Sequence, residues 1–321
     1  MAMKVNAVVA SSTISLLLLL PSIAYCANGP SLGGSDIRTA YLPSKPGFYG
    51  GIATQRSSTH ASHGNDGKEK PQASVNAYAL ATYLSVQYVY PQQWLGGTIA
   101  SGVRLGYNVA GNFELNGDQQ SFTGMIDPYL DIIKWSKNFG VIGATGNEVQ
   151  GSPLPYGLTA QVAYSMIFGL GDYDQHKNLT PGRGTHYAIP GMAVSYLTQP
   201  GFLGDGIEYS ARVQAGYAFK NRHTSYESGT VWSFDTAASI RNGRWQYGLT
   251  AFMNYQFDDD KMEGRTVGKH GSRLREIRGG PVVAYAIPGT PSTVKFKFSA
   301  PIQARNTLSV TEFLITLGFP L

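Results

Sequence analysis

Ten charged side chains fall on the polar side of stretches in which polar and apolar residues alternate. Alternation with a period of two places successive side chains on opposite faces of a β-strand, so these charges would share one face of a sheet. They could filter a solute by charge, or pair with one another and close the space that they line, and the pattern leaves both open. They are Arg104, Asp127, Asp131, Glu208, Arg212, Asp235, Glu276, Arg278, Lys295 and Lys297.

Three aromatic side chains, Tyr83, Tyr129 and Phe252, have the same parity as these charges in their own strands. Rings among polar groups would offer contact area to a small apolar solute, since ligand sites combine apolar surface with a few polar groups. Charges and rings together form the candidate substrate-binding set. We predict no cofactor for it.

Histidines and acidic residues offer a second kind of chemistry, metal binding. Only His60 and His63 have a ligand-like spacing, and the other histidines fall singly in or beside polar stretches predicted to be loops. The run Asp258 to Asp260 could bind Ca²⁺ or bridge lipopolysaccharide through a divalent ion. Polar loops commonly carry such residues without binding anything, so we predict no metal site.

Serine, histidine and aspartate are all present, which keeps a lipid hydrolase or lipid-modifying enzyme as an alternative. A Gly-x-Ser-x-Gly elbow is absent from the sequence. The partners of a catalytic triad cannot be found from spacing alone. We therefore assign no catalytic residue and predict a protein that is not an enzyme.

The clearest structural element is a hairpin between Ser228 and Asp258. Apolar residues alternate with polar ones from Trp232 to Ile240, and again from Trp245 to Phe257. The sequence Arg-Asn-Gly-Arg (241–244) joins the two runs, and Asn-Gly favours a type I′ turn because both residues adopt positive φ readily. The sequence predicts two antiparallel strands, each with one apolar and one polar face.

These strands are near the roughly 9–11 residues that a tilted strand needs to cross a bilayer. Aromatic residues stand at the ends of the apolar faces, as in the girdles of outer-membrane barrels. Charged residues make up 14% of the chain, against roughly 25% in a typical soluble domain. No apolar run after Leu20 is long enough for a membrane helix. We predict a transmembrane β-barrel. The net charge of +5 is spread along the chain, so nucleic acid is not an expected partner.

About twelve strands can be traced between Gly47 and Leu321, joined alternately by long polar loops and short turns. This is the pattern of an all-β, antiparallel, up-and-down outer-membrane barrel with its loops outside and its turns in the periplasm. Residues 136–155 are the exception. We predict that they form an enlarged turn at the periplasmic mouth, since counting another strand there would make the total odd.

The N-terminus predicts export. Lys4 precedes an apolar run that ends at Pro21, and small residues follow, which is typical of a signal peptide over residues 1–26. Cleavage could follow Ala24 or Cys26, and Cys26 is the only cysteine, so no disulfide can form within the chain. We expect residues 27–46 to be a periplasmic lead-in and residues 47–321 to form the barrel.

Residues 306–321 resemble the closing strand that the barrel-assembly machinery recognises in outer-membrane proteins, although the last residue is Leu321 and not an aromatic. Four further stretches resemble the barrel family named for the meta-pathway of phenol degradation. They are 171–174 (GDYD) with 181–183 (PGR), 221–229 (NRHTSYESG) with Asp235, 280–285 (GPVVAY), and 304–306 (ARN).

This resemblance implies an outer-membrane channel that takes up small hydrophobic or aromatic compounds, passively and selectively. Its expected partners are outer-membrane lipid, lipopolysaccharide, the assembly machinery and a small apolar solute. A general porin and a barrel-embedded lipid enzyme are the alternatives within the membrane. A secreted soluble β-sandwich would instead bury the apolar strand faces between two sheets.

Overall fold

The computed structural model describes residues 32–70, 74–143, 154–177, 179–267 and 272–321. Within them every regular element is a β-strand, and no helix is long and apolar enough to cross a membrane. The strands are β1 (Gly47–Ser62), β2 (Val75–Trp94), β3 (Gly97–Leu115), β4 (Asp118–Ser121), β5 (Gly124–Gly140), β6 (Gly157–Ile167), β7 (Tyr187–Leu197), β8 (Gly206–Ala218), β9 (Tyr226–Glu227), β10 (Val231–Asn242), β11 (Trp245–Gln256), β12 (Lys261–Met262), β13 (Arg265–Thr266), β14 (Arg275–Ala286), β15 (Thr293–Arg305) and β16 (Leu308–Pro320).

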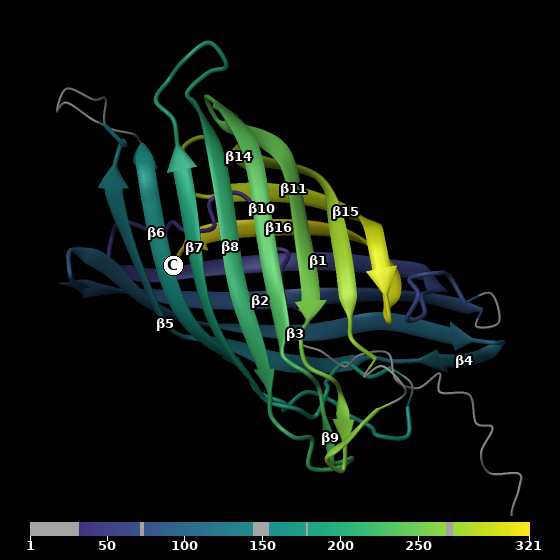
Figure 1. Cartoon of the computed structure of the whole chain (residues 1–321). Helices are drawn as coiled ribbons and strands as arrows, with labels where there is room; N and C mark the ends of the chain where they lie inside the picture. The colour runs from purple at the N-terminus through teal and green to yellow at the C-terminus, as the bar shows by residue number, and fades with distance from the viewer. Residues whose placement is uncertain (1–31, 71–73, 144–153, 178, 268–271) are drawn as a thin grey trace, which may run out of the picture.

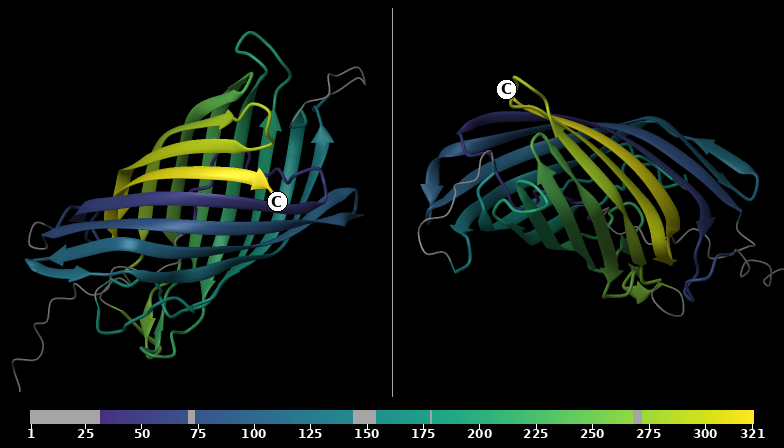
Figure 2. Two further views of the ribbon diagram at one scale, coloured as in Figure 1. Left: turned by 180° about the vertical axis from the view of Figure 1, so that it is seen from behind. Right: turned by 90° about the horizontal axis from the view of Figure 1, so that it is seen from above.

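The long strands close into a barrel (Figure 1). Each pairs antiparallel with its neighbours in sequence, and β1 pairs with β16 from Tyr49 opposite Pro320 up to Ser62 opposite Leu308. Seen from behind, β16 in yellow lies beside β1 in purple (Figure 2). The predicted antiparallel barrel of twelve strands is confirmed. The β-sandwich alternative is wrong, because the long strands form one sheet that closes on itself and does not pack face to face against another.

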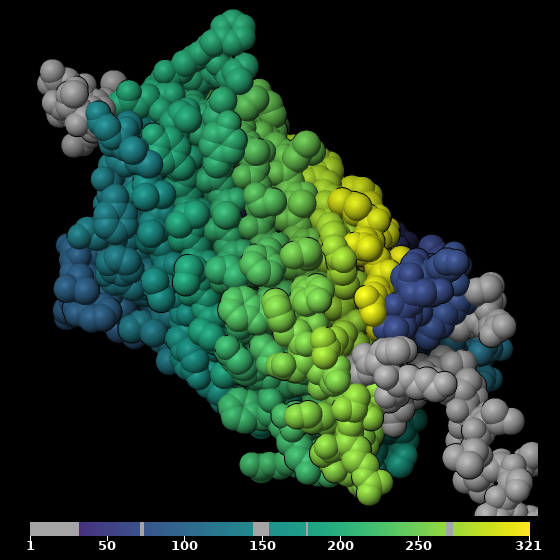
Figure 3. Space-filling model, viewed as in Figure 1, coloured from purple at the N-terminus to yellow at the C-terminus, as the bar shows by residue number. Residues whose placement is uncertain are grey.

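The two faces of the strands divide as the alternation predicts. On β11, Leu249 and Tyr247 are exposed on the outer wall, whereas Gln246, Asn254 and Gln256 are buried inside. The side chains of the front wall cover the near face of the molecule from teal through green to yellow (Figure 3). A lipid-facing outer wall and a polar interior are what an outer-membrane barrel needs, because lipid and lumen alternate along every strand.

The hairpin of β10 and β11 is confirmed, but the predicted turn type is wrong. Asn242 pairs with Trp245, so the two loop residues are Gly243 and Arg244. Gly243 has a φ of 57°, and Arg244 has no positive φ, which is the pattern of a type II′ turn. A loop shifted by one residue would place Arg241 opposite Arg244, and like charges directly opposite are destabilising. In the observed register Arg241 faces Gln246.

The predicted turn over 136–155 begins too early. Ser136 to Gly140 belong to β5, which pairs with β6 as far as Gly140 opposite Leu158. A register shift between Asp131 and Ile133 breaks the alternation that marks the rest of the strand. Residues 144–153 of this predicted turn, and the predicted signal peptide with its cleavage site, lie outside the described residues.

The end of the barrel with the long connections, here named the loop end, carries a small sheet of β9, β12 and β13, seen at the lower end of Figure 1. Asp260 holds it together. Its carboxylate accepts hydrogen bonds from the Tyr226 hydroxyl at 2.5 Å, the Gly229 amide at 2.9 Å and the Gln256 amide at 2.7 Å. Burial raises the pKa of Asp260, and these donors oppose that rise. In the acidic run of residues 258–260, Asp260 therefore stabilises the small sheet.

The wall has an irregular stretch between β15 and β16. The two strands pair from Thr293 opposite Gly318 to Ser299 opposite Glu312, and both then continue without pairing to each other. Pro301 has no N–H to donate, and the extra residue Ile302 forms a bulge against β14. Beyond this point β15 stays with β14, and β16 stays with β1. We name residues 300–305 and 308–311 the seam.

Replacing Leu249 by Arg tests the assignment of the faces. Leu249 lies mid-strand on the outer wall with 67% of its surface exposed. An arginine there must enter the hydrocarbon of the bilayer, and we expect it to lower the free energy of unfolding by about 2–4 kcal/mol. Denaturant titration in lipid vesicles measures this. Leu249→Ala is the matched control, and equal losses in the two variants would mean that position 249 does not face lipid.

Candidate functional site

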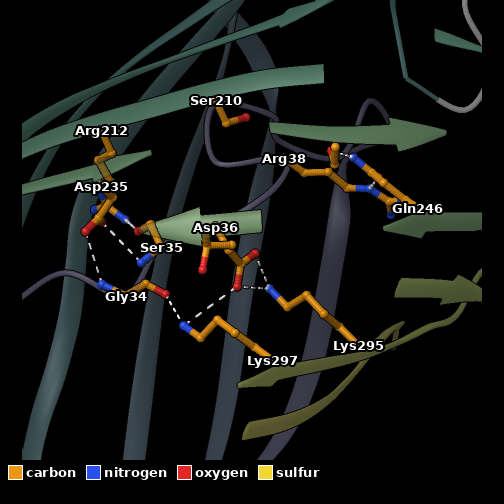
Figure 4. Close-up of polar contacts among 12 residues, drawn as sticks. Gly34, Ser35, Asp36, Arg38, Ser210, Arg212, Asp235, Gln246, Lys295 and Lys297 are labelled. Carbon is orange, nitrogen blue, oxygen red and sulfur yellow. Dashed lines mark hydrogen bonds and ion pairs between the residues drawn. The ribbon is translucent and has the colours of Figure 1, made fainter. Parts of the chain in front are cut away.

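The lumen contains a segment of the chain itself. Residues 32–41, here named the plug, run inside the barrel before β1 begins, and their polar groups meet side chains from several walls (Figure 4). This differs from the predicted periplasmic location of residues 27–46. The reason is that the inward charges of the wall find partners on this segment, as the following contacts show.

Asp36 is the centre of the plug's contacts with β15. Its carboxylate lies 2.6 Å from Nζ of Lys295 and 3.8 Å from Nζ of Lys297. Lys297 also donates to the backbone carbonyl of Gly34. Asp36 and Lys297 are almost fully buried, so each charge needs the other. The two lysines predicted to face the lumen therefore bind the plug.

Asp235 of β10 holds the plug from the opposite direction. Its two carboxylate oxygens accept hydrogen bonds from the amides of Gly34 and Ser35, each at 3.1 Å. Arg212 of β8 donates to the Ser35 hydroxyl at 3.0 Å (Figure 4). Gly33 has a φ of 82°, and a Cβ atom there would lie 2.5 Å from the Ser233 hydroxyl oxygen. The approach to β10 therefore requires glycine at position 33.

A third set of contacts surrounds Arg38. The backbone amide of Arg38 donates to the Glu208 carboxylate at 2.5 Å. The side-chain Nε of Arg38 donates to the amide oxygen of Gln246 at 2.6 Å. Gln246 donates in turn to Glu208 at 2.8 Å, so the carboxylate is shared between plug and wall. At the end of the plug, the Ala40 carbonyl accepts a hydrogen bond from the Ser136 hydroxyl at 2.6 Å. Contacts thus pin the plug along its whole length.

Two apolar side chains of the plug also enter the wall. Leu32 packs in a buried cluster with Tyr187, Ile189, Val231 and Leu274. Ile37 packs separately against the small inward residues Ala237, Val282 and Ala284. The lumen therefore has two apolar patches among its polar side chains, and the plug fills both.

Phe252, Glu276 and Arg278 form a neighbouring cluster. The Arg278 guanidinium lies 2.7 Å from Glu276 and 3.4 Å from Glu312, and its carbon lies 4.5 Å from the centroid of the Phe252 ring. Gln55 of β1 also donates to Glu312 at 2.9 Å. Arg278, which the sequence predicted to face the lumen, thus links β14 to β16 next to the seam.

The remaining predicted residues contact the wall and its loops, and Tyr129 also packs against the cluster that contains Leu32. Asp127 accepts hydrogen bonds from the amides of Gly171 and Arg183, which anchors the loop after β6. Asp131 pairs with Lys134 at 2.6 Å. Arg104 lies 5.4 Å from the centroid of the Tyr129 ring. The ring of Tyr83, another predicted lumen residue, packs against Gly106, where a Cβ atom would lie 2.7 Å from it.

These positions favour the interpretation that the inward charges are paired and help to close the lumen, over the interpretation that they filter solutes by charge. Most of the predicted charges pair with the plug, with one another or with backbone amides. Arg104 remains exposed in the lumen. Their role in binding a solute stays a prediction. In the described residues, no three His, Cys, Asp or Glu side chains form a group that could hold a metal ion.

The sequence matches the family described as "Putative MetA-pathway of phenol degradation" over residues 54–315. The chain belongs to this family. The matched region spans nearly the whole barrel wall and begins after the plug, so the lumen contacts described above join a family-typical wall to a segment outside the match. No match was found among curated proteins.

Solved structures of similar fold are outer-membrane barrels. The COG4313 outer membrane channel from Pseudomonas putida F1 has a TM-score of 0.72 and 10% identity, covering 89% of this chain and 100% of that chain. The transport unit of the autotransporter AIDA-I from Escherichia coli has a TM-score of 0.50 and 14% identity, covering 93% of this chain and 96% of that chain. At such identities the likeness establishes the fold.

Sequence reasoning missed the plug residues Asp36 and Arg38, but one signal pointed to them. Lys295 and Lys297 turn inward side by side on β15. Their cross-strand neighbours are Ala284 and Val282 on β14 and Thr316 and Leu314 on β16, none of which is acidic. Two inward lysines on one strand without an acid directly opposite indicate that an anion from elsewhere in the chain pairs with them.

Replacing Asp36 by Asn tests whether these contacts hold the plug. The change removes the carboxylate that pairs with Lys295 and with the buried Lys297, and losing one partner of a buried pair costs about 3–5 kcal/mol. We expect the plug to leave the lumen more often, and single-channel recording in planar bilayers should show at least a tenfold higher open probability. Asp118→Asn, at an exposed acid of β4, is the control. An unchanged open probability for Asp36→Asn would mean that this ion pair does not close the barrel.

Proposed function

We propose that this protein is a passive outer-membrane channel for small apolar or aromatic solutes, closed at rest by its own N-terminal segment. The observation that carries the proposal is the double character of the plug. Its polar groups pair with the charges of the lumen wall, and Leu32 and Ile37 occupy apolar patches on that wall. A lumen that releases the plug would expose both patches to a solute.

The occupied lumen speaks against a general porin. Twelve strands enclose a narrower space than the 16–18 strands of porins, which leave an aqueous channel. Here that space also holds a segment bonded to β5, β8, β10, β11 and β15. Free diffusion of hydrophilic solutes would need a path that is open all the time. Slow passage of a solute that binds the wall needs only brief release of the plug.

Apolar surface inside the lumen supports the solute class. Phe252 lies beside Gly33, whose Cβ would stand 3.1 Å from the ring, so movement of the plug uncovers an aromatic face. The family description names phenol degradation, which fits an aromatic solute. The seam adds a route, since backbone pairing between β15 and β16 is missing where a lipid-soluble molecule could pass sideways into the membrane.

A lipid enzyme is the second candidate within the membrane. The lumen has a buried chain of hydroxyls in which Ser195 lies 2.6 Å from Ser210, and Ser210 donates to Glu208 at 2.8 Å. No histidine belongs to this series of hydrogen bonds among the described residues, so the series lacks the base that activates a serine in many hydrolases. Glu208 also binds Arg38 of the plug. The arrangement favours a structural role, and we propose no catalytic activity.

Uptake into proteoliposomes tests the solute class. The full-length protein should admit phenol slowly and exclude sugars of similar size. A variant that lacks residues 32–41 should admit both and conduct ions continuously. A large, steady and nonselective conductance of the full-length protein would instead make it a general porin. Release of fatty acids from the liposome lipid would make it an enzyme.

Two aromatic side chains are predicted to contact the solute. Phe252→Ala and Tyr129→Ala should each change the rate of phenol uptake several-fold, since stacking contacts contribute about 0.5–1.5 kcal/mol beyond area burial. Tyr247→Ala, on the outer face, is the control and should leave uptake unchanged. If both lumen variants take up phenol at the wild-type rate, these rings are not on the path.

A further inference from the structure

On the barrel wall near the loop end, three arginines surround one pocket. Arg275 of β14 and Arg305 of β15 stand directly opposite each other, and Tyr255 of β11 lies opposite Arg275 on its other side. Arg273, just before β14, completes the group. These four residues help to line a pocket of about 130 Å³.

The row Tyr255–Arg275–Arg305 faces outward. In β14 the neighbouring Glu276 is buried in the lumen, so Arg275 must point to the other face of the strand. Ala304 of β15 pairs with Glu276 and is also buried, which turns Arg305 outward in the same way. The arginines therefore stand on the wall that meets lipid, and not among the charges of the channel.

The charge of Arg275 and Arg305 is unmet within the described part of the chain. No carboxylate there forms an ion pair with either residue, and the buried Nε atom of each has no hydrogen-bond partner there. Arg305 donates to the neutral side chain of Asn65 at 2.9 Å, while Asp259 pairs with Arg273 at 2.6 Å. Like charges directly opposite on paired strands destabilise a sheet, so packing within the protein does not explain this pair.

Neighbouring aromatic rings place the arginines at the membrane surface. Tyr255 and Phe257 have ring centroids 4.9 Å apart, and Phe257 and Trp232 have centroids 6.0 Å apart. Such a belt marks the level at which lipid headgroups meet water. The guanidinium groups thus stand at the height of headgroup phosphates, and the planar fork of arginine matches the oxygens of a phosphate.

We propose that Arg275 and Arg305 bind a phosphate group of a lipid in the outer leaflet, such as the phosphorylated glucosamine headgroup of lipopolysaccharide. The anion replaces the missing counter-charge between the two strands. Arg273 adds positive charge at the rim of the pocket, and the Tyr255 ring borders the lipid. The site lies on the outer face of the wall, away from the lumen, and Arg305 places it beside the seam.

Binding of lipid A to the full-length protein in detergent micelles tests the proposal. We expect diphosphorylated lipid A to bind and to raise Tm, and fully dephosphorylated lipid A to do neither. The double variant Arg275→Gln/Arg305→Gln should bind diphosphorylated lipid A at least tenfold more weakly, about the loss expected for one charge-assisted hydrogen bond. Arg244→Gln, an exposed arginine in the turn between β10 and β11, should bind like the wild type.

Arg275→Gln alone separates binding from a structural role. Without lipid it should raise Tm, because it removes the like-charge contact with Arg305. With diphosphorylated lipid A the wild type should be the more stable protein. A merely structural arginine would lower Tm on removal in both conditions. Arg275 has no recorded partner within the described residues, so this variant should fold even if changes at Arg305 disturb its contact with Asn65.

Three results would overturn the proposal. The first is equal binding of phosphorylated and dephosphorylated lipid A by the wild type. The second is wild-type affinity in the double variant. The third is an equal rise in Tm with millimolar inorganic phosphate alone, which would make the pocket a site for free anions and not for a lipid.

Discussion

The structure depends on one constraint: a charge removed from water must find a partner. The barrel turns acidic and basic side chains into a narrow lumen, where an unpaired charge is far costlier than in bulk water. Some of these charges pair across the wall, as Arg278 does with Glu276. Others, such as Lys297, have no acidic residue directly opposite on the adjacent strands, and among the described residues Asp36 of the plug forms the ion pair with it. The path of residues 32–41 follows from this shortage.

Much of the wall could be predicted from the sequence, because alternation is a local property. In β10 and β11 buried residues alternate with more exposed ones from end to end, and the faces are the predicted ones. Prediction failed where the period breaks. The register shift near Ile133 hid the end of β5. The turn between β10 and β11 is shifted by one residue, from the predicted Asn242-Gly243 to Gly243-Arg244, because of a cross-strand repulsion that neither strand shows by itself. The plug has no period at all, so only its partners could have indicated it.

The same constraint acts on both faces of β14 and β15, with different partners. Inside, the protein satisfies its own cations with carboxylates such as Asp36 and Glu276. Outside, Arg275 and Arg305 face each other without an acid in the described residues. If a lipid phosphate binds there as proposed, the surroundings supply outside what the chain supplies in the lumen. On either face, an unmet charge is the observation from which a partner is inferred.

A closed resting state does not require a tightly bound plug. If the open state lies about 3 kcal/mol above the closed one, roughly 1% of the barrels are open at any moment. The ion pairs and hydrogen bonds of the plug together exceed that difference, but a released plug regains water contacts, which offset most of their contribution. A solute that binds the apolar patches left by Leu32 and Ile37 binds only the open state. By that preference alone it shifts the population toward opening. Solutes that gain nothing from apolar patches do not, so one segment can both close the channel and select what opens it.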